Sequence, residues 1–415
     1  MSFATRRRRR PPLRLVAFIV VLVAVAAAVV LIRAATTGTP ALTVQRVLPA
    51  SVRFPGAAPA PAWPKTGEAA VEVEGLGSLG SSGPQTPVPI ASVAKIMTAY
   101  VILQDHPVTV GHPGFSVTIG SADVADYRSR LGQGELVTPV ASGEVLTEVQ
   151  LLQALLVASG NNIAPILANY DAGSVPAFVA KMNSTAHELG MDHTTYTDAS
   201  GIAATTVSTA SDQLRLAAAA MKQPVFAQTV AMKSVKLPVA GTIPNFNRAV
   251  GTGGYVGIKT GSDALAGGCL VFANRQTIGG RTVTILGVVL RQDPGQPSTP
   301  ILTAASQSAA DALVQSVRSA IRTETVVPAG AAVATVSNAQ GKRITAVTGS
   351  AITALGWGGM TQPIKVSLAK PGNSIAAGAT VAQVSVPSGQ PAQVGATASA
   401  PVPAVSFGWK VRNVL

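Results

Sequence analysis

Hydrophobic positions run without interruption near the N-terminus and become periodic further along the chain. Residues 15–32 are eighteen apolar side chains without a charge, and Arg33 follows them. As a helix this stretch would be about 27 Å long, close to the thickness of the hydrocarbon core of a bilayer. The pattern therefore predicts a single transmembrane anchor at residues 15–33.

A basic cluster precedes this segment and predicts its orientation. Arg6 to Arg10 form an unbroken run, and Arg14 follows. Positive charge of this kind stays on the cytoplasmic side, so residues 1–14 are expected in the cytoplasm and the rest of the chain outside. A cleaved signal peptide is the alternative. We favour the retained anchor, because the apolar region is long for a signal and Arg33 stands where a cleavage motif would begin.

Residues 34–64 are rich in Ala, Pro and Thr without helical periodicity, which indicates a stalk. Helical periodicity then predicts helices at residues 91–104, 147–158, 163–169, 175–189, 208–221 and 302–321. Strand-like runs occur at residues 71–73, 255–259, 269–274 and 282–290, with a Gly/Ser-rich loop or hairpin at 75–83. Consecutive strands on short turns favour an antiparallel sheet with helices packed on it. We therefore expect one α+β domain at residues 65–323.

The pattern changes again after Val326. Short β-type runs alternate with Gly/Pro turns at residues 333–336, 344–347, 364–368 and 381–385, and residues 405–411 are taken as a last strand. No cluster of titratable groups accompanies them. Residues 326–415 are therefore expected to form a small all-β domain that serves as a spacer or a binding module.

Charge and cysteine content narrow the function classes. Seven of the thirteen net positive charges flank the membrane segment, so the rest of the chain carries only +6. Without an aromatic-basic stripe, this argues against nucleic-acid binding. Cys269 is the only cysteine and lies in an apolar run, which indicates a buried structural thiol. The four histidines lack a ligand spacing, so neither a metal nor another cofactor is expected.

Three short motifs carry the candidate chemistry, and the first supplies a nucleophile and a base. They are Ser92-Val93-Ala94-Lys95, Ser159-Gly160-Asn161 and Lys259-Thr260-Gly261. Ser92 lies near a helix start and Lys95 one turn on, so their side chains share a face. A serine needs a neighbour to take its proton, and a lysine can do so only when neutral. Burial and a second cation, for which Lys259 is the candidate, would lower the pKa of Lys95 accordingly.

The other two motifs suit a cleft. Ser159 and Asn161 fall on a turn between two helices, where a hydroxyl and an amide could point into it. Lys259 to Gly261 end a strand that could pair with an extended peptide, with Gly261 allowing close approach. A second Lys-Thr-Gly at residues 65–67 follows the stalk directly and is taken as coincidence.

Taken together, the motifs resemble those of the D-alanyl-D-alanine carboxypeptidases, the low-molecular-weight penicillin-binding proteins of serine peptidase family S11. The resemblance covers about residues 65–323, and residues 375–381 look more loosely like the small β domain of many members. The segments that carry the resemblance are residues 91–100, 155–162, 190–201 and 208–210. It implies a β-lactamase/transpeptidase-like fold: an antiparallel sheet flanked by helices, with a helical subdomain.

The resemblance also implies an acyl-enzyme mechanism. Ser92 would attack the carbonyl between two terminal D-alanines of a peptidoglycan stem peptide, Lys95 would accept its proton, and Ser159 would relay a proton to the leaving amine. β-Lactams would be inhibitors. The remaining implied roles are Asn161 for the substrate amide, Lys259 and Thr260 for the terminal carboxylate, and the backbone N–H groups of Ser92 and Ser262 for the oxyanion.

Two departures from the family pattern leave the preferred substrate open. Asn162 stands where many members have Asp. Ser262-Asp263 follows Lys-Thr-Gly, where an aromatic residue or His, then Thr, is common, and Asp263 would place a negative charge near the carboxylate site.

Three alternatives share these motifs. A class A β-lactamase needs a glutamate to activate the deacylating water, and the only one between Asn161 and Lys259 is Glu188, without the expected surroundings. That favours a peptidase that penicillin inhibits. A D,D-endopeptidase would look the same in sequence. A non-catalytic envelope protein that binds cell-wall peptide is the third alternative.

Overall fold

The computed structural model describes residues 13–293, 295, 298–370 and 372–414, and these form two units. Residues 55–323 and 355–359 form an α+β unit, and the remainder forms a β unit that includes the N-terminal helix. The basic run Arg6 to Arg10 lies outside the described residues.

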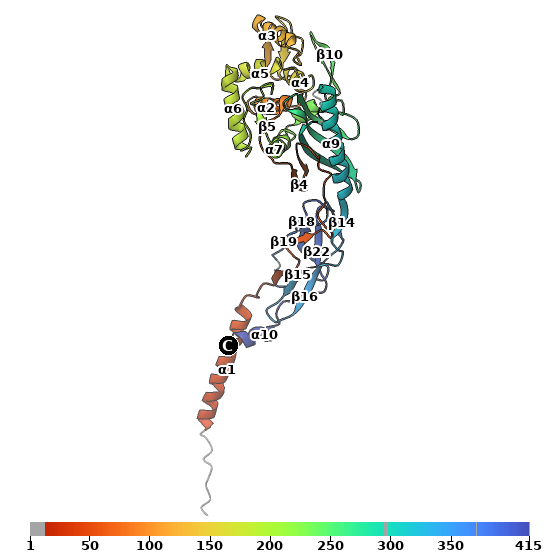
Figure 1. The fold of residues 1–415 in the computed structure, drawn as a ribbon. Coiled ribbons are helices and arrows are strands. Elements are labelled where there is room, and N and C mark those ends of the chain that lie inside the picture. Colours follow the sequence, from red (N-terminus) through yellow and green to blue (C-terminus); the bar gives the residue numbers. More distant parts are fainter. Residues whose placement is uncertain (1–12, 294, 296–297, 371, 415) are drawn as a thin grey trace, which may run out of the picture. The chain divides into compact units, whose positions relative to one another are not determined.

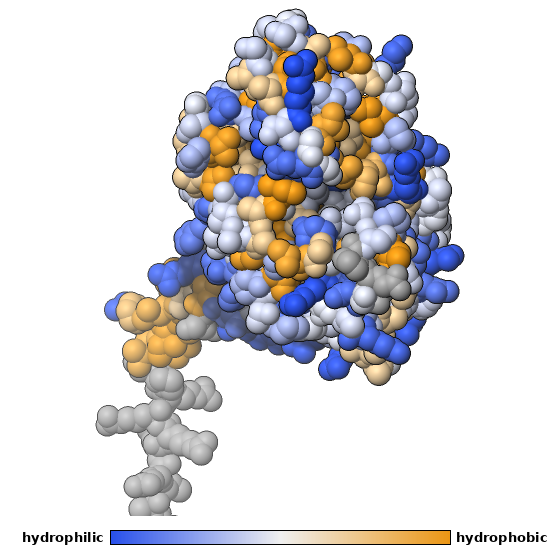
Figure 2. Space-filling model, turned by 45° about the horizontal axis from the view of Figure 1, so that its top comes forward, coloured by the Kyte–Doolittle hydropathy of each residue, from blue (hydrophilic) through white to orange (hydrophobic). Residues whose placement is uncertain are grey.

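Helix α1 (Leu13–Thr36) covers the predicted anchor and extends it at both ends. It is long and apolar enough to cross a membrane, and the apolar window within it is not buried against the protein. In Figure 2 this helix is the hydrophobic, orange segment at the lower left. The same length and composition are typical of a signal sequence, so α1 by itself gives no orientation.

The α+β unit is built on a five-stranded antiparallel sheet, as the sequence predicted (Figure 1). Its strands, in spatial order, are β11 (Tyr255–Asp263), β12 (Gly267–Ile278), β13 (Arg281–Gln292), β3 (Glu68–Val73) and β4 (Gly77–Ser82). The β3–β4 hairpin is the Gly/Ser-rich segment at 75–83. Strand β11 carries Lys259 to Gly261 and is an edge strand of this sheet. One side of this motif is therefore not paired with another strand of the sheet.

Helices cover both faces of the sheet (Figure 1). Helix α9 (Thr299–Ala320) packs on β11, β12 and β13, whereas α7 (Ala210–Ala220) packs on β13 and β3. The helical part contains α2 (Lys95–Asp105), α4 (Glu148–Leu156), α5 (Ile163–Ala172) and α6 (Val175–Glu188), together with α3 (Ser121–Gly132) and α8 (Pro224–Val230). Short strands complete it: β5 (Val88–Pro89), β6 (Ser116–Thr118), β7 (Val145–Thr147), β8 (Val207–Ser208), β9 (Ser234–Leu237) and β10 (Gly241–Pro244).

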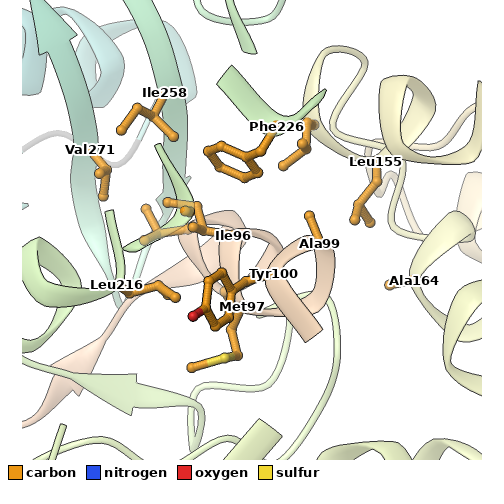
Figure 3. Packing of buried hydrophobic residues seen from close by; sticks show 14 of the residues in the cluster. Ile96, Met97, Ala99, Tyr100, Leu155, Ala164, Leu216, Phe226, Ile258 and Val271 are labelled. Atoms are coloured by element: carbon orange, nitrogen blue, oxygen red, sulfur yellow. The ribbon is translucent and has the colours of Figure 1, made fainter. Parts of the chain in front are cut away.

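Helix α2 is the centre of this unit, because every residue from Lys95 to Leu103 is buried. Figure 3 shows Ile96 and Met97 within the buried cluster that surrounds the helix. Labelled neighbours in that view come from other elements: Leu155 of α4, Leu216 of α7, Phe226 of α8, Ile258 of β11 and Val271 of β12. Truncating such a side chain to alanine typically costs about 2–5 kcal/mol. The packing therefore holds the N-terminus of α2 in one position.

The β unit corrects the predicted stalk. Strand β1 (Thr43–Arg46) pairs with β15 (Ala332–Ser337), and β2 (Ser51–Arg53) pairs with β18 (Thr361–Pro363). Part of residues 34–64 is therefore an ordered portion of this unit. The sequence did not reveal it because both strands are short and lack a fully buried face, so no apolar alternation marks them.

The all-β character predicted for residues 326–415 holds except at its end. One sheet has the order β1, β15, β16 (Arg343–Thr348), β22 (Val394–Ala398), β20 (Thr380–Ser385) and β19 (Lys365–Leu368). The remaining strands are β14 (Arg322–Val327), β17 (Ile352–Gly356) and β21 (Gly389–Gln390). The last strand predicted at 405–411 is wrong: helix α10 (Phe407–Asn413) forms there, since Ser406 caps it by accepting a bond from Trp409 N.

Candidate active site

The Ser92–Lys95 pair lies at the start of the central helix. A 3₁₀ turn (Ala91–Ala94) carries Ser92 and runs directly into α2, whose first residue is Lys95. Lys95 Nζ lies 2.7 Å from Ser92 Oγ. Ala91 has a φ of +45°, a left-handed conformation that non-glycine residues rarely adopt. Strain of this kind is concentrated at functional sites, where the surrounding structure holds it in place.

Lys95 has three hydrogen-bond partners although its side chain is completely buried. Besides Ser92, Nζ lies 2.6 Å from Asn161 Oδ1 and 3.1 Å from the carbonyl oxygen of Ser200. A neutral amine has two hydrogens and one lone pair. Because Asn161 Oδ1 and Ser200 O can only accept, the two hydrogens belong to them and the lone pair faces the Ser92 hydroxyl. This arrangement allows the amine to take the serine proton.

Burial lowers the pKa of Lys95 well below its usual 10.5, and the charge of Lys259 lowers it further. Asp198 and Glu135 act in the opposite direction. Lys259 is buried too; this lowers its own pKa to about 7, and its Nζ donates to Thr260 O at 3.0 Å. Lys259, the second cation that the sequence predicted, therefore lowers the pKa of Lys95.

The second motif lies against Lys95 through Asn161. Ser159, next to it, has a φ of +60° and a buried Oγ without a hydrogen-bond partner in the described part of the chain. Gly160 is required by a close contact, since a Cβ there would lie 2.4 Å from Thr138 Oγ1. Asn162 is structural: its side chain accepts from Thr138 N and donates to Thr138 O.

The third motif borders the nucleophile through its glycine. A Cβ on Gly261 would lie 2.7 Å from Ile90 O and 3.2 Å from Ser92 N. The glycine therefore lets β11 approach the chain's own nucleophile segment, whereas the sequence had suggested a role in admitting substrate. Thr260 Oγ1 is buried and has no partner among the described residues. Ser262 follows Gly261 on the same strand and is half-buried.

Asp263 is engaged in the turn after β11. Its Oδ1 accepts hydrogen bonds from Leu265 N and Ala266 N, each at 2.7 Å. The carboxylate that the sequence placed near a carboxylate-binding site thus stabilises the β11–β12 turn.

The second Lys-Thr-Gly, at residues 65–67, lies against the sheet and not at the site. A Cβ on Gly67 would lie 2.1 Å from Leu290 O, so the glycine allows the chain to pack closely on β13. Cys269 is fully buried, as predicted.

Sequence reasoning missed Asp198, which shapes the loop behind Lys95. Its carboxylate accepts bonds from the backbone N–H groups of Ser200, Gly201 and Ile202 and from two hydroxyls. A Cβ on Gly201 would lie 1.8 Å from Ala91 O, so this loop packs directly beside the nucleophile turn. The loop delivers the Ser200 carbonyl to Lys95. An Asp two residues before Ser-Gly was the only sequence signal for this turn.

Glu135 was also missed, because it belongs to no motif and lies 26 residues before Asn161. Its Oε2 accepts a hydrogen bond of 2.8 Å from Asn161 Nδ2 and lies 3.1 Å from Arg130 Nη1. The Glu188 considered in the sequence instead lies at the exposed end of α6. A glutamate does therefore lie beside the Lys95–Asn161 pair.

Comparison with known proteins agrees with this geometry. A family model described as D-alanyl-D-alanine carboxypeptidase matches residues 75–293. The D-alanyl-D-alanine carboxypeptidase of Streptomyces sp. strain K15 is 34% identical over 218 residues, which cover 48% of this chain and 71% of the relative. The D-alanyl-D-alanine endopeptidase of Pseudomonas aeruginosa is 33% identical over 165 residues, 39% of this chain and only half of the relative's length.

Solved structures show the same relationship. The Streptomyces K15 DD-transpeptidase superposes with a TM-score of 0.51 and 28% identity, over 64% of this chain and 98% of that one. A peptidoglycan synthesis regulatory factor from Streptococcus pneumoniae shares the fold, with a TM-score of 0.58 over 83% of this chain and all of that one, at 21% identity. Because the family model spans more than half of the sequence and the Streptomyces relative is covered over most of its length, this chain belongs to the D-alanyl-D-alanine carboxypeptidase family of serine peptidases, family S11.

Proposed function

We propose that this protein is a serine D-alanyl-D-alanine carboxypeptidase that removes the terminal D-alanine from peptidoglycan stem peptides. The observation that carries the proposal is the buried Lys95, whose Nζ lies 2.7 Å from Ser92 Oγ and whose pKa is lowered by burial and by Lys259. A base of this kind activates a serine at neutral pH.

Acylation begins when Ser92 Oγ attacks the carbonyl carbon of the peptide bond between the two D-alanines and its proton passes to Lys95 Nζ. The developing oxyanion is held by the backbone N–H groups of Ser92 and Ser262, which the approach of β11 to the nucleophile turn favours. Asn161 Nδ2 has a second hydrogen besides the one given to Glu135, and this one is assigned to a substrate carbonyl.

The leaving D-alanine then needs a proton on its amine. Ser159 is the proposed relay, and its buried Oγ, without a partner in the described structure, is free for that role. Water next attacks the ester on Ser92, the bond to Oγ breaks, and Oγ regains a proton. The products are the shortened stem peptide and the free serine.

A cavity of about 500 Å³ beside Thr260 supports a free carboxylate as the substrate's end. Its lining contains two buried polar atoms without partners among the described residues, Thr260 Oγ1 and Asn247 Nδ2. Arg248 lines it as well and forms no ion pair within the described chain, whereas Asp311 already accepts bonds from Tyr255 and Gln307. Two donors and a cation suit a carboxylate. This supports the carboxypeptidase reaction over the endopeptidase reaction, to which a relative's name also points.

We further propose that β-lactams acylate Ser92, and that α1 is retained as a single-pass anchor with the remaining chain outside the cytoplasm. The length and apolar composition of α1 support the anchor. The substrate is a cell-wall peptide, so this orientation places the site where its substrate lies.

The experiment uses the full-length protein in detergent and a stem peptide ending in D-Ala-D-Ala. Released D-alanine is measured for the wild type and for Ser92→Ala, with a D-alanine cross-linked dimer peptide as the second substrate. The proposal predicts D-alanine release that Ser92→Ala abolishes. Cleavage of the dimer alone would indicate an endopeptidase, rapid penicillin turnover a β-lactamase, and no reaction with either peptide or penicillin a non-catalytic envelope protein.

A further inference from the structure

A second segment is hydrogen-bonded to the Ser159–Asn162 motif and is linked to Lys95 only through Asn161. Residues 135–138 follow α3, and their backbone is fixed to the motif because Asn161 N donates to Leu136 O at 2.8 Å. Thr138 bonds the side chain of Asn162 on both its N–H and its C=O. Only the Glu135 side chain extends from this segment to Asn161, and it is only 10% exposed.

The chemistry of Glu135 decides which end of the Asn161 amide faces Lys95. An ionised carboxylate has only acceptors, so the atom 2.8 Å from it must be the Nδ2 donor. The oxygen at the other end of the amide then faces Lys95 Nζ at 2.6 Å. With the amide turned around, an N–H group would face the lysine amine and a carbonyl oxygen would face a carboxylate. Glu135 therefore excludes the unproductive orientation.

Arg130 holds Glu135 in this position. Its Nη1 lies 3.1 Å from Glu135 Oε2, and its Nε lies 2.7 Å from Asp126 Oδ2 on the same helix. The Glu135 N–H group also donates to Arg130 O at 3.0 Å. Four charged groups act on Lys95: Lys259 and Arg130 disfavour its cation, and Asp198 and Glu135 favour it. The Glu135–Arg130 pair thus contributes one charge of each sign.

We propose that Glu135, held by Arg130, is a positioning residue for the reaction. It fixes the Asn161 amide with its oxygen toward Lys95, and Arg130 fixes the Glu135 carboxylate in turn. This inference rests on the proposed function, since it assigns Asn161 and Lys95 their parts in acylation. No residue of the three motifs reveals it.

The test measures acylation of the full-length protein by a fluorescent penicillin as a function of pH. Glu135→Gln keeps an acceptor for Asn161 Nδ2 but removes the negative charge, so the rising acid limb should move to lower pH with the plateau rate kept. Arg130→Gln removes a positive charge and should move the limb to higher pH. Glu135→Leu removes the acceptor, and the plateau rate should fall about 10-fold or more. Glu188→Gln, which removes an exposed glutamate of the same unit, should match the wild type.

Melting temperatures accompany each variant, because a structural loss would lower stability without moving a pH limb in opposite directions. Unchanged profiles in Glu135→Gln and Glu135→Leu, or limbs that move the same way in Glu135→Gln and Arg130→Gln, would overturn the inference. If Glu135→Leu does not fold, the inference is tested by the opposite pH shifts expected for Glu135→Gln and Arg130→Gln. A wild type that penicillin does not label would overturn the proposed function and this inference together, which separates the two failures.

Discussion

Lys95 Nζ and Ser92 Oγ lie 2.7 Å apart at the junction of a 3₁₀ turn and the most buried helix of the α+β unit. The lysine has no exposed surface, and its hydrogen atoms have acceptors on Asn161 and Ser200. A flexible surface lysine would sample many rotamers, whereas this one is held at its partner. The pair is therefore preorganised for proton transfer before substrate arrives.

Replacing Lys95 should abolish most acylation even where the charge is kept. Lys95→Arg cannot become neutral and Lys95→Met has no base, so both should lower the rate of penicillin acylation by about 10²–10⁴-fold. Stopped-flow or gel-based labelling measures the rate. Lys236→Arg, on the exposed side of β9, is the control and should keep the wild-type rate. A fully active Lys95→Met would mean that another group takes the Ser92 proton.

The pH profile should rise and then fall. Lys95 works only when neutral, so kcat/KM for a D-Ala-D-Ala peptide rises as the pH passes its lowered pKa. The family resemblance implies that Lys259 binds the substrate carboxylate, which requires its charged form, so the proposal predicts that kcat/KM falls again above its pKa of about 7. Lys259→Arg stays protonated and should lose the falling limb. A falling limb unchanged in a folded Lys259→Arg would assign it to another group.

Gly201 should tolerate no side chain. Its φ is +80° and an added Cβ would lie 1.8 Å from Ala91 O, next to the nucleophile. Gly201→Ala should therefore lower the melting temperature and reduce acylation about 10-fold or more, through backbone strain and a displaced Ser92. Gly190→Ala is a matched control, because Gly190 also has a positive φ but has no atom within 4 Å of the added Cβ. Equal effects of both changes on acylation would contradict the account.

The cavity beside Thr260 gives a specificity prediction. Arg248→Gln should raise KM for a peptide ending in a free D-alanine carboxylate, whereas the same peptide with a C-terminal amide should be affected far less. Steady-state kinetics with the two peptides measures the difference. Arg275→Gln, an exposed arginine on β12, is the control. An equal rise in KM for the two peptides would show that Arg248 does not bind the carboxylate.

The motifs could be read from the sequence because their chemistry is local. Ser92 and Lys95 are one helical turn apart, and an apolar pattern marks α2, which begins at Lys95. An apolar pattern also marks β11, which carries Lys259 to Gly261, and its neighbours β12 and β13. Antiparallel pairing followed from the short turns between those strands. Helix α3 gave no such signal, since none of its residues is fully buried.

The remaining site residues depend on long-range folding. Glu135 reaches Asn161 across 26 residues, and the Ser200 carbonyl reaches Lys95 across 105. Every residue has a backbone carbonyl, so the sequence cannot show which one binds a side chain. A single glutamate after a helix looks the same in sequence whether it is exposed to solvent or bonded to a site residue. The hydrogen bonds that Asp263 Oδ1 accepts from Leu265 N and Ala266 N likewise became visible only with the turn geometry, which no residue pattern specified.

The most direct test of the central claim is the mass of the intact protein after exposure to benzylpenicillin, followed by peptide mapping of the adduct. The account predicts one adduct per chain, located on Ser92, absent in Ser92→Ala and strongly slowed in Lys95→Met. An adduct on another residue, or a Ser92→Ala protein that is still labelled, would contradict it.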